Sequence, residues 1–238
     1  MKTNQMTSFR GIATIGSFCL AAVLGAALLS PSMMVQASEG RIVPAPMQDE
    51  TVGKGTETAI FAGGCFWGVQ GVFQHVGGVI SATSGYAGGA ADTAKYETVS
   101  TGSTGHAEAV KIIYDPSKVT YGHLLQIYFS VVTDPTQLNQ QGPDHGTQYR
   151  TAIFPTTAMQ TTIAKAYIDQ LQAAHVYGAP IVTRIESGKF YKAEAHHQDY
   201  LALHPTQAYI AVNDIPKVQD LKSMFPGDYR GQPVLVMN

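Results

Sequence analysis

The chain has 238 residues, of which 45% are hydrophobic, so it is long enough for one domain with a leader or tail and too apolar for a disordered chain. Acidic residues outnumber Lys and Arg by 17 to 15, which argues against a nucleic-acid partner because such proteins usually carry a basic surface. The sequence contains 2 cysteines, Cys19 and Cys65, which excludes a multi-disulfide scaffold and a zinc site of four cysteines.

Residues 1–37 resemble a secretory signal peptide. Two basic residues, Lys2 and Arg10, precede an uncharged apolar stretch over residues 11–29. Val35-Gln36-Ala37 then has the small-residue pattern of a cleavage site. A single membrane anchor is the alternative, because the stretch approaches the roughly 20 residues that a span needs. Cleavage predicts an exported protein, periplasmic or extracellular, with 13 bases, 17 acids, a net charge of −4 and Cys65 as its only cysteine.

The remaining chain is interpreted as a linker followed by one domain. Residues 38–57 are rich in Pro, Gly, Thr and charge without a sustained period, which is typical of a linker, and residues 58–238 form the predicted catalytic domain. Strand-like runs are interleaved with helical patterns there, which predicts an α/β or α+β domain with helices packed on a sheet. The predicted strands are 58–62, 78–86, 107–114, 149–154 and 181–185, and the predicted helices are 65–75, 120–131, 156–174, 194–203 and 214–224.

The most informative segment is Gly64-Cys65-Phe66-Trp67-Gly68, where a predicted strand turns into a predicted helix. A thiol at a helix N-terminus is expected to have a lowered pKa, because free N–H groups and the helix dipole stabilise the thiolate. Phe66 and the only tryptophan, Trp67, are expected to line an apolar pocket. The alternative is an inert cysteine buried under two core aromatics, since free cysteines are usually buried.

Glu108 is a candidate general acid on a predicted strand. It shares a strand face with Val110 and Ile112, because alternate residues of a strand point to the same side. Apolar surroundings raise the pKa of a carboxyl group, so that it stays protonated and can donate a proton. An ionised, solvated glutamate at the edge of the sheet is an equally weighted alternative.

Two other polar segments are less informative. Residues 142–150 form a polar loop that leads into a strand, so they predict either a binding surface or a turn built on Asp and Gly. Adjacent side chains on a helix diverge by about 100°, so His196-His197 is a poor pair of metal ligands. We therefore expect these two histidines to have structural or surface roles.

Taken together, these motifs resemble those of the A-type peptide methionine sulfoxide reductases. They occur in the order typical of that family over residues 58–229, and GCFWG with a downstream GHAE is highly specific. The matching segments are Gly64-Cys65-Phe66-Trp67-Gly68, Gly85-Tyr86-Ala87-Gly88-Gly89, Tyr96 with Gly105-His106-Ala107-Glu108, Asp134-Pro135-Thr136-Gln137, Asp144-His145-Gly146-Thr147-Gln148-Tyr149-Arg150, and Ala193-Glu194 with His197-Gln198-Asp199-Tyr200-Leu201.

The resemblance implies reduction of the S epimer of methionine sulfoxide, free or in proteins, to methionine. Cys65 matches the nucleophile that attacks the sulfoxide sulfur as a thiolate, and Glu108 matches the acid that protonates the departing oxygen. Tyr96 and Tyr149 match two phenols that hydrogen-bond that oxygen. The family fold is a two-layer α/β sandwich around a central mixed sheet, with a ferredoxin-like core.

The resemblance also implies a set of substrate-binding residues. Phe66 and Trp67 would form an apolar wall for the methyl group, and Asp144, His145 and Tyr209 would complete the binding set. Relatives usually carry an acid or proline and then an aromatic residue where this chain has Ala195-His196. We therefore expect that part of the substrate rim to differ from the rim of those relatives.

The low cysteine count has a consequence for regeneration of the enzyme. Oxygen transfer would leave Cys65 as a sulfenic acid, and many relatives resolve it with a cysteine that follows a tyrosine near the C-terminus. Here Tyr209 is followed by Ile210, and no cysteine follows Cys65. The chain therefore resembles the one-cysteine members, so we expect no bound cofactor and an external reductant, either a thioredoxin-like protein or a small thiol.

The expected partners are oxidised proteins and free methionine sulfoxide, with no nucleic acid, no membrane contact beyond a retained leader, and a monomeric state. Two other function classes compete with this interpretation. Cys65, His106 and Asp144 could act together in acyl transfer, as in cysteine hydrolases. A non-catalytic exported protein could instead use Phe66 and Trp67 to bind thioethers.

Overall fold

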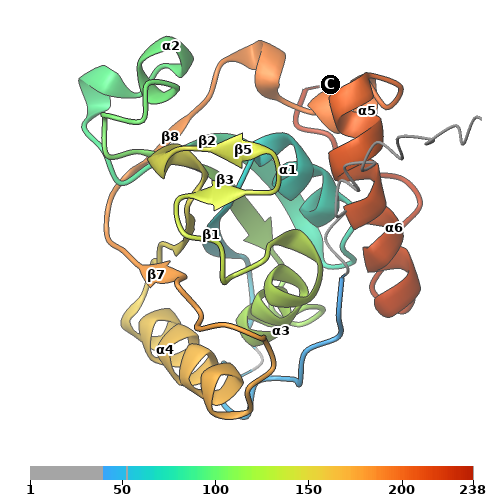
Figure 1. Ribbon diagram of the computed structural model, residues 1–238. Helices are drawn as coiled ribbons and strands as arrows, with labels where there is room; N and C mark the ends of the chain where they lie inside the picture. The colour runs from blue at the N-terminus through green and yellow to red at the C-terminus, as the bar shows by residue number, and fades with distance from the viewer. Residues whose placement is uncertain (1–39, 52, 238) are drawn as a thin grey trace, which may run out of the picture. The chain divides into compact units, whose positions relative to one another are not determined.

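The computed structural model describes residues 40–51 and 53–237 of the chain (Figure 1). The predicted signal peptide over residues 1–37, with Cys19, lies outside the described residues. Within the described part, no helix is long and apolar enough to cross a membrane.

A six-stranded sheet forms the centre of the fold, in the order β7-β6-β1-β3-β2-β8. Every neighbouring pair is antiparallel except β6 and β7, which makes the sheet mixed. The strands are β1 (Glu57–Gly63), β2 (Val79–Ala87), β3 (Ala107–Tyr114), β6 (Thr151–Ile153), β7 (Arg184–Ile185) and β8 (Phe190–Lys192).

The helices connect these strands in a ferredoxin-like order. The chain runs β1-α1-β2-β3-α3-β6, and the four strands of this unit lie in the order β6-β1-β3-β2. In Figure 1, α4 lies beside β7, and α5 and α6 lie on the side of α1. The helices are α1 (Phe66–Gln74), α2 (Tyr96–Val99), α3 (Tyr121–Ile127), α4 (Ala158–Ala173), α5 (Tyr200–Leu203) and α6 (Ile215–Met224).

The two faces of the sheet are packed differently. One face carries large side chains such as Phe61 and Ile112, which are fully buried in the same core as Val69 of α1 and Leu124 of α3. The opposite face carries mostly alanines, with Phe154 and Phe190 packed against them. The main core therefore lies between the sheet and its helices. Each large side chain buried there contributes about 1.5–3 kcal/mol to the stability of the folded state. The predicted two-layer α/β sandwich with a central mixed sheet is confirmed.

Two of the predicted helices differ from the structure. The helix predicted over 194–203 is interrupted, because Asp199 adopts a left-handed conformation with φ 57° between a 3-10 turn and α5. Its carboxylate accepts hydrogen bonds from Gln74 and from two backbone N–H groups near the C-terminus. The helix predicted over 120–131 ends as an α-helix at Ile127 and continues as one π-type turn (Tyr128–Val132).

Two strand predictions also need correction, and three short strands were not predicted. The strand predicted over 149–154 begins only at Thr151, because Tyr149 lies in a 3-10 turn (Thr147–Tyr149). The strand predicted over 181–185 is reduced to the two residues of β7. The pattern did not predict β8 or the hairpin formed by β4 (Gln140–Gln141) and β5 (Asp144–His145).

The described part of the predicted linker packs against the domain. It contains no helix or strand before β1, yet Val43 is fully buried. Asp49 and Glu50 accept hydrogen bonds from the backbone N–H groups of Gly122 (2.8 Å) and Tyr121 (2.7 Å). These carboxylates satisfy free donors at the first turn of α3, where negative charge is favourable.

Candidate active site

Cys65 lies where the central strand β1 turns into α1, at the residue that precedes the first turn of that helix. Gly64 makes the turn with φ +95°, and a Cβ atom added there would lie 2.6 Å from Gln141, so a larger residue does not fit. The Cys65 thiol is free and is only 9% exposed. The predicted position of the cysteine at a strand-to-helix turn is therefore correct.

The expected effect of this position on the thiol is wrong. Burial raises the pKa of the Cys65 thiol well above its usual range, and the charges of Glu108, Asp214 and Asp144 add to the rise. The backbone N–H of Trp67 favours the thiolate, but it does not outweigh these effects. The protonated thiol is therefore the resting form at neutral pH.

Glu108 lies on the helix-covered face of β3 and is 3% exposed. Its Oε2 accepts a hydrogen bond of 3.0 Å from the backbone N–H of Phe66, the residue after Cys65. Burial raises the pKa of Glu108 to about 8, and the nearby charges of Asp144 and Asp214 contribute to the rise. The neutral carboxyl predominates at pH 7, which does not fit the alternative of an ionised edge residue.

The two phenols named from the sequence come from separate loops. Tyr149 ends the 3-10 turn before β6, and Tyr96 is the first residue of α2. Burial raises the pKa of both phenols, and the charges of Glu108 and Cys65 raise it further. Both tyrosines therefore lie close enough to this pair to sense its charge, and both remain neutral hydrogen-bond donors.

Aromatic side chains from α1 and the C-terminal region form one side of the site. The half-buried ring of Trp67 stacks on Tyr200 at a centroid distance of 4.0 Å and meets the edge of Tyr209 at 6.0 Å. Phe66 is only 1% exposed, and its ring packs against Tyr86 and His197. Trp67 therefore offers apolar surface to a ligand, whereas Phe66 supports it from within the core.

The other three predicted binding residues lie around the β4–β5 hairpin. The Tyr209 hydroxyl donates a hydrogen bond to the Asp144 carboxylate. Burial raises the pKa of Asp144, while this hydrogen bond and the charges of Lys217 and His145 oppose the rise. His145 itself is exposed, so it lies at the outer side of this group.

Glu194 had no individual role in the sequence interpretation, whereas His197 was expected to have only a structural or surface role. Glu194 accepts hydrogen bonds from the Tyr86 hydroxyl (2.7 Å) and the Tyr96 backbone N–H (2.9 Å). His197 accepts one from Trp67 Nε1 at 3.3 Å. Glu194 and His197 belong to segments that carry the family resemblance, so that signal could have identified them.

Asp214 is the residue that sequence reasoning missed most completely. It is fully buried beside the first turn of α1, where a Cβ atom added to Gly68 would lie 2.1 Å from its Oδ1. Lys217 Nζ lies 3.6 Å from the same oxygen, and burial raises the Asp214 pKa to about 6. The sequence indicated only a helix start at Asp214, which carries no information about the distant Cys65.

The acyl-transfer alternative does not fit the surroundings of His106. Its Nδ1 accepts a hydrogen bond from the Gly89 N–H (3.2 Å), and its Nε2 donates to the Ala90 carbonyl (2.9 Å). The ring is 1% exposed, so neither nitrogen is free to act as a base for Cys65. In residues 40–51 and 53–237, no group of three His, Cys, Asp or Glu side chains could hold a metal ion.

Comparison with known proteins agrees with this geometry. The family model described as peptide methionine sulfoxide reductase matches residues 57–228. The chain is 65% identical over 191 residues to peptide methionine sulfoxide reductase MsrA 2 of Mesorhizobium japonicum, which covers 80% of this chain and 98% of the relative. It is 43% identical over 218 residues to MsrA 2 of Synechocystis, with 90% and 99% covered.

Solved structures show the same similarity. Reduced Mxr1 of Saccharomyces cerevisiae has a TM-score of 0.59 and 29% identity, with 75% of this chain and 97% of that chain covered. Methionine sulfoxide reductase A of Corynebacterium diphtheriae has a TM-score of 0.55 and 32% identity, with 72% and 88% covered. The chain therefore belongs to the peptide methionine sulfoxide reductase family, and the predicted A-type reductase is confirmed.

Proposed function

We propose that this oxidoreductase reduces the S epimer of methionine sulfoxide, free and in proteins, to methionine. The observation that supports the proposal most directly is the position of a neutral acid, Glu108, beside the segment that carries Cys65. Glu108 accepts the N–H of Phe66, the residue next to Cys65, and its pKa of about 8 keeps it protonated at neutral pH. A buried thiol and a proton donor are the two groups that oxygen transfer from a sulfoxide requires.

In the proposed step, Cys65 Sγ attacks the sulfoxide sulfur while Glu108 donates its proton to the sulfoxide oxygen. The attack forms a bond between Sγ and the substrate sulfur. That bond and the sulfur–oxygen bond then break as the protonated oxygen transfers to Sγ, which releases methionine and leaves a Cys65 sulfenic acid. The thiol proton returns to the Glu108 carboxylate, which balances the reaction. The substrate sulfur gains two electrons, and Sγ loses them.

Other residues bind and orient the substrate in this proposal. The hydroxyls of Tyr96 and Tyr149 donate to the sulfoxide oxygen, because both phenols remain neutral near Glu108. The half-buried face of Trp67, supported by Phe66, holds the methyl group. Polar parts of the substrate bind on the other side of the site, at Asp144 with Tyr209 and the exposed His145.

An external thiol regenerates the enzyme in this scheme. No cysteine follows Cys65, and the residue after Tyr209 is the buried Ile210. The first thiol attacks the sulfenic sulfur, forms a mixed disulfide and releases water. A second thiol then displaces Cys65, and the reductant leaves as a disulfide. A thioredoxin-like protein or a small thiol serves as this reductant, and the enzyme carries no bound cofactor.

The proposed setting is the repair of oxidised exported proteins by a monomer outside the cytoplasm. The apolar stretch over residues 11–29 and the small residues at Val35-Gln36-Ala37 support export and cleavage. Mass measurement of the N-terminus of protein purified from the producing cells tests this. A mature chain that begins at Ser38 is expected, and a chain that retains residues 1–37 would contradict it.

The reaction is tested with separated epimers of methionine sulfoxide and dithiothreitol, with methionine formation as the measurement. Product is expected from the S epimer and not from the R epimer, and C65S is the inactive control. Without reductant, each enzyme molecule should form about one methionine and retain a sulfenic acid that dimedone traps. No product from the S epimer would refute the activity, and about two methionines per enzyme would refute the one-cysteine mechanism.

A further inference from the structure

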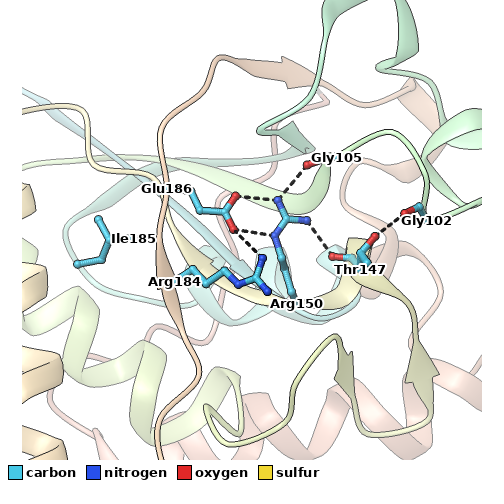
Figure 2. A pocket seen from close by; sticks show the side chains of 7 residues that line it. All are labelled: Gly102, Gly105, Thr147, Arg150, Arg184, Ile185 and Glu186. Atoms are coloured by element: carbon cyan, nitrogen blue, oxygen red, sulfur yellow. Dashed lines mark hydrogen bonds and ion pairs between the residues drawn. The ribbon is translucent and has the colours of Figure 1, made fainter.

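Arg150 is a buried arginine next to the site with no role in the proposed chemistry. It lies between the 3-10 turn that carries Tyr149 and strand β6, and it is 6% exposed. Figure 2 shows its guanidinium between the Glu186 carboxylate and the backbone oxygens of Gly105 and Thr147. Its side chain connects the turn that carries Tyr149 with the segment that precedes β3.

All the N–H groups of Arg150 have partners. Nε and Nη2 donate to the two oxygens of Glu186, each at 2.8 Å, which forms a bidentate pair. Nη2 also donates to the Gly105 carbonyl at 3.0 Å. Nη1 donates to the carbonyls of His106 (3.2 Å) and Thr147 (2.8 Å). Arg150 therefore has no free donor for an anion in the surface hollow that it lines.

The carbonyls bound by Arg150 belong to segments that carry the reacting groups. Gly105 and His106 immediately precede β3, on which Glu108 lies. Thr147 is two residues before Tyr149 in the 3-10 turn. One guanidinium therefore fixes the backbone that leads to the acid and the backbone that leads to a phenol.

His106 extends this connection to the second phenol. Its ring holds the backbone of Gly89 and Ala90 through the two hydrogen bonds described above. These residues begin the loop that leads to α2, where Tyr96 lies, and the Tyr96 N–H is held from the other side by Glu194. The segments that carry Glu108, Tyr149 and Tyr96 thus share one hydrogen-bonded support.

We propose that Arg150, oriented by Glu186, is a positioning residue that sets the spacing between Glu108 and the two phenols around the sulfoxide oxygen. The inference rests on the proposed function and adds a residue that does not touch the substrate. Arginine is required because its planar fork makes five directed bonds, whereas lysine offers one ammonium and cannot bind Glu186 bidentately. Loss of this geometry leaves buried carbonyls unsatisfied at both active-site segments.

The test uses R150K and the milder E186Q, with R184Q as the matched control. The Arg184 side chain is 53% exposed and lies 4.0 Å from the same Glu186 carboxylate. The interactions marked in Figure 2 join it to Glu186 and not to Gly105 or Thr147. We measure methionine formed from the S epimer in a single turnover without reductant. R150K should be about 10- to 100-fold slower and E186Q about 3- to 10-fold slower, because small displacements of reacting groups are costly. R184Q should stay within about twofold.

The pH profile separates positioning from a general loss of stability. In R150K and E186Q, displacement of the segments around Glu108 should admit water to its carboxyl group. Because water stabilises the ionised form, the pKa of Glu108 should fall, and the alkaline limb of the single-turnover rate should move to lower pH. Alkylation of Cys65 by iodoacetamide at fixed pH should stay within about twofold, because Cys65 is held by β1 and α1. The titratable groups that face Glu108 and contribute to the same profile are Cys65, Tyr86, Tyr96, Tyr149, Asp144 and Asp214.

Two results would overturn the inference. One is a folded R150K with the rate and alkaline limb of the wild type, and E186Q decides in the same way if R150K does not fold. The other is a loss of rate with an unmoved limb and an equal change in Cys65 alkylation, since this indicates only a structural role. If the wild type forms no methionine from the S epimer, the proposed function fails instead, so the two failures are distinguishable.

Discussion

The substitution E108Q should weaken catalysis and, at the same time, stabilise the folded protein at alkaline pH. An amide keeps the shape of the Glu108 side chain and can still accept the Phe66 N–H, but it cannot donate an acidic proton. The rate of the first methionine formed should fall by about 10²- to 10⁴-fold, the usual contribution of a general acid. The effect on stability has the opposite sign because the site holds a carboxyl that water would ionise.

The size of the stability effect follows from the shifted pKa. Burial raises the pKa of Glu108 from 4.5 to about 8. At about 1.4 kcal/mol per pKa unit, this corresponds to on the order of 5 kcal/mol. Between these values the folded state holds a proton that the unfolded state has lost, so the unfolding free energy falls as pH rises. This contribution is fully present below pH 4.5 and is lost as pH rises through about 8.

Urea denaturation of both proteins at several pH values between about 4 and 9 tests this reasoning. The unfolding free energy of E108Q minus that of the wild type should increase from pH 4.5 to about 8 and then level off. The difference isolates Glu108, because other buried acids such as Asp214 titrate in both proteins. E97Q, which changes an exposed glutamate of α2, is the control. A difference that does not vary with pH would refute a neutral, buried Glu108.

Three other changes test different contacts of the site. D214N should lower the pKa of the Cys65 thiol, because a like charge is removed, and should speed iodoacetamide alkylation several-fold, with the exposed D169N as control; an unchanged rate would contradict the influence of Asp214. G68A should lower the unfolding free energy by about 1–3 kcal/mol in urea denaturation, because its Cβ would lie 2.1 Å from Asp214 Oδ1; a wild-type value would exclude this clash. Y209F should lower kcat/KM for the S epimer about tenfold, since Asp144 loses its donor, and wild-type kinetics would remove Tyr209 from the binding set.

Local sequence rules predicted the elements whose causes are local. The apolar alternation of residues 107–114 and the helical period after Thr157 both correspond to elements of the structure. The hydroxyls of Thr120 and Thr157 accept hydrogen bonds from the N–H groups three residues later and so cap their helices. These features depend on side-chain period and capping chemistry, which a short window of sequence contains.

Features that depend on distant residues could not be predicted in this way. Residues 194–203 have a helical pattern, but the fold holds Asp199 in a left-handed conformation through bonds to Gln74 and to the C-terminal backbone. The pKa of Cys65 shows the same limit. Its position at a helix N-terminus was predictable, whereas the choice between a lowered pKa and a buried thiol depended on the fold around it and on the charge of Asp214, which is far along the chain.

One cause explains the shifted pKa values of both Cys65 and Glu108, and it is consistent with the proposed reaction. Burial disfavours the charged form of each group, so the resting site contains a thiol and a neutral carboxyl. Oxygen transfer from a sulfoxide to a thiol produces no net charge, because the proton donated by Glu108 is replaced by the proton of Cys65. The buried site therefore has to accommodate charge only transiently, while the polar sulfoxide and the hydroxyls of Tyr96 and Tyr149 surround the oxygen. The spacing of Glu108, Tyr96 and Tyr149 around that oxygen is then more important for the reaction than a permanently ionised Cys65.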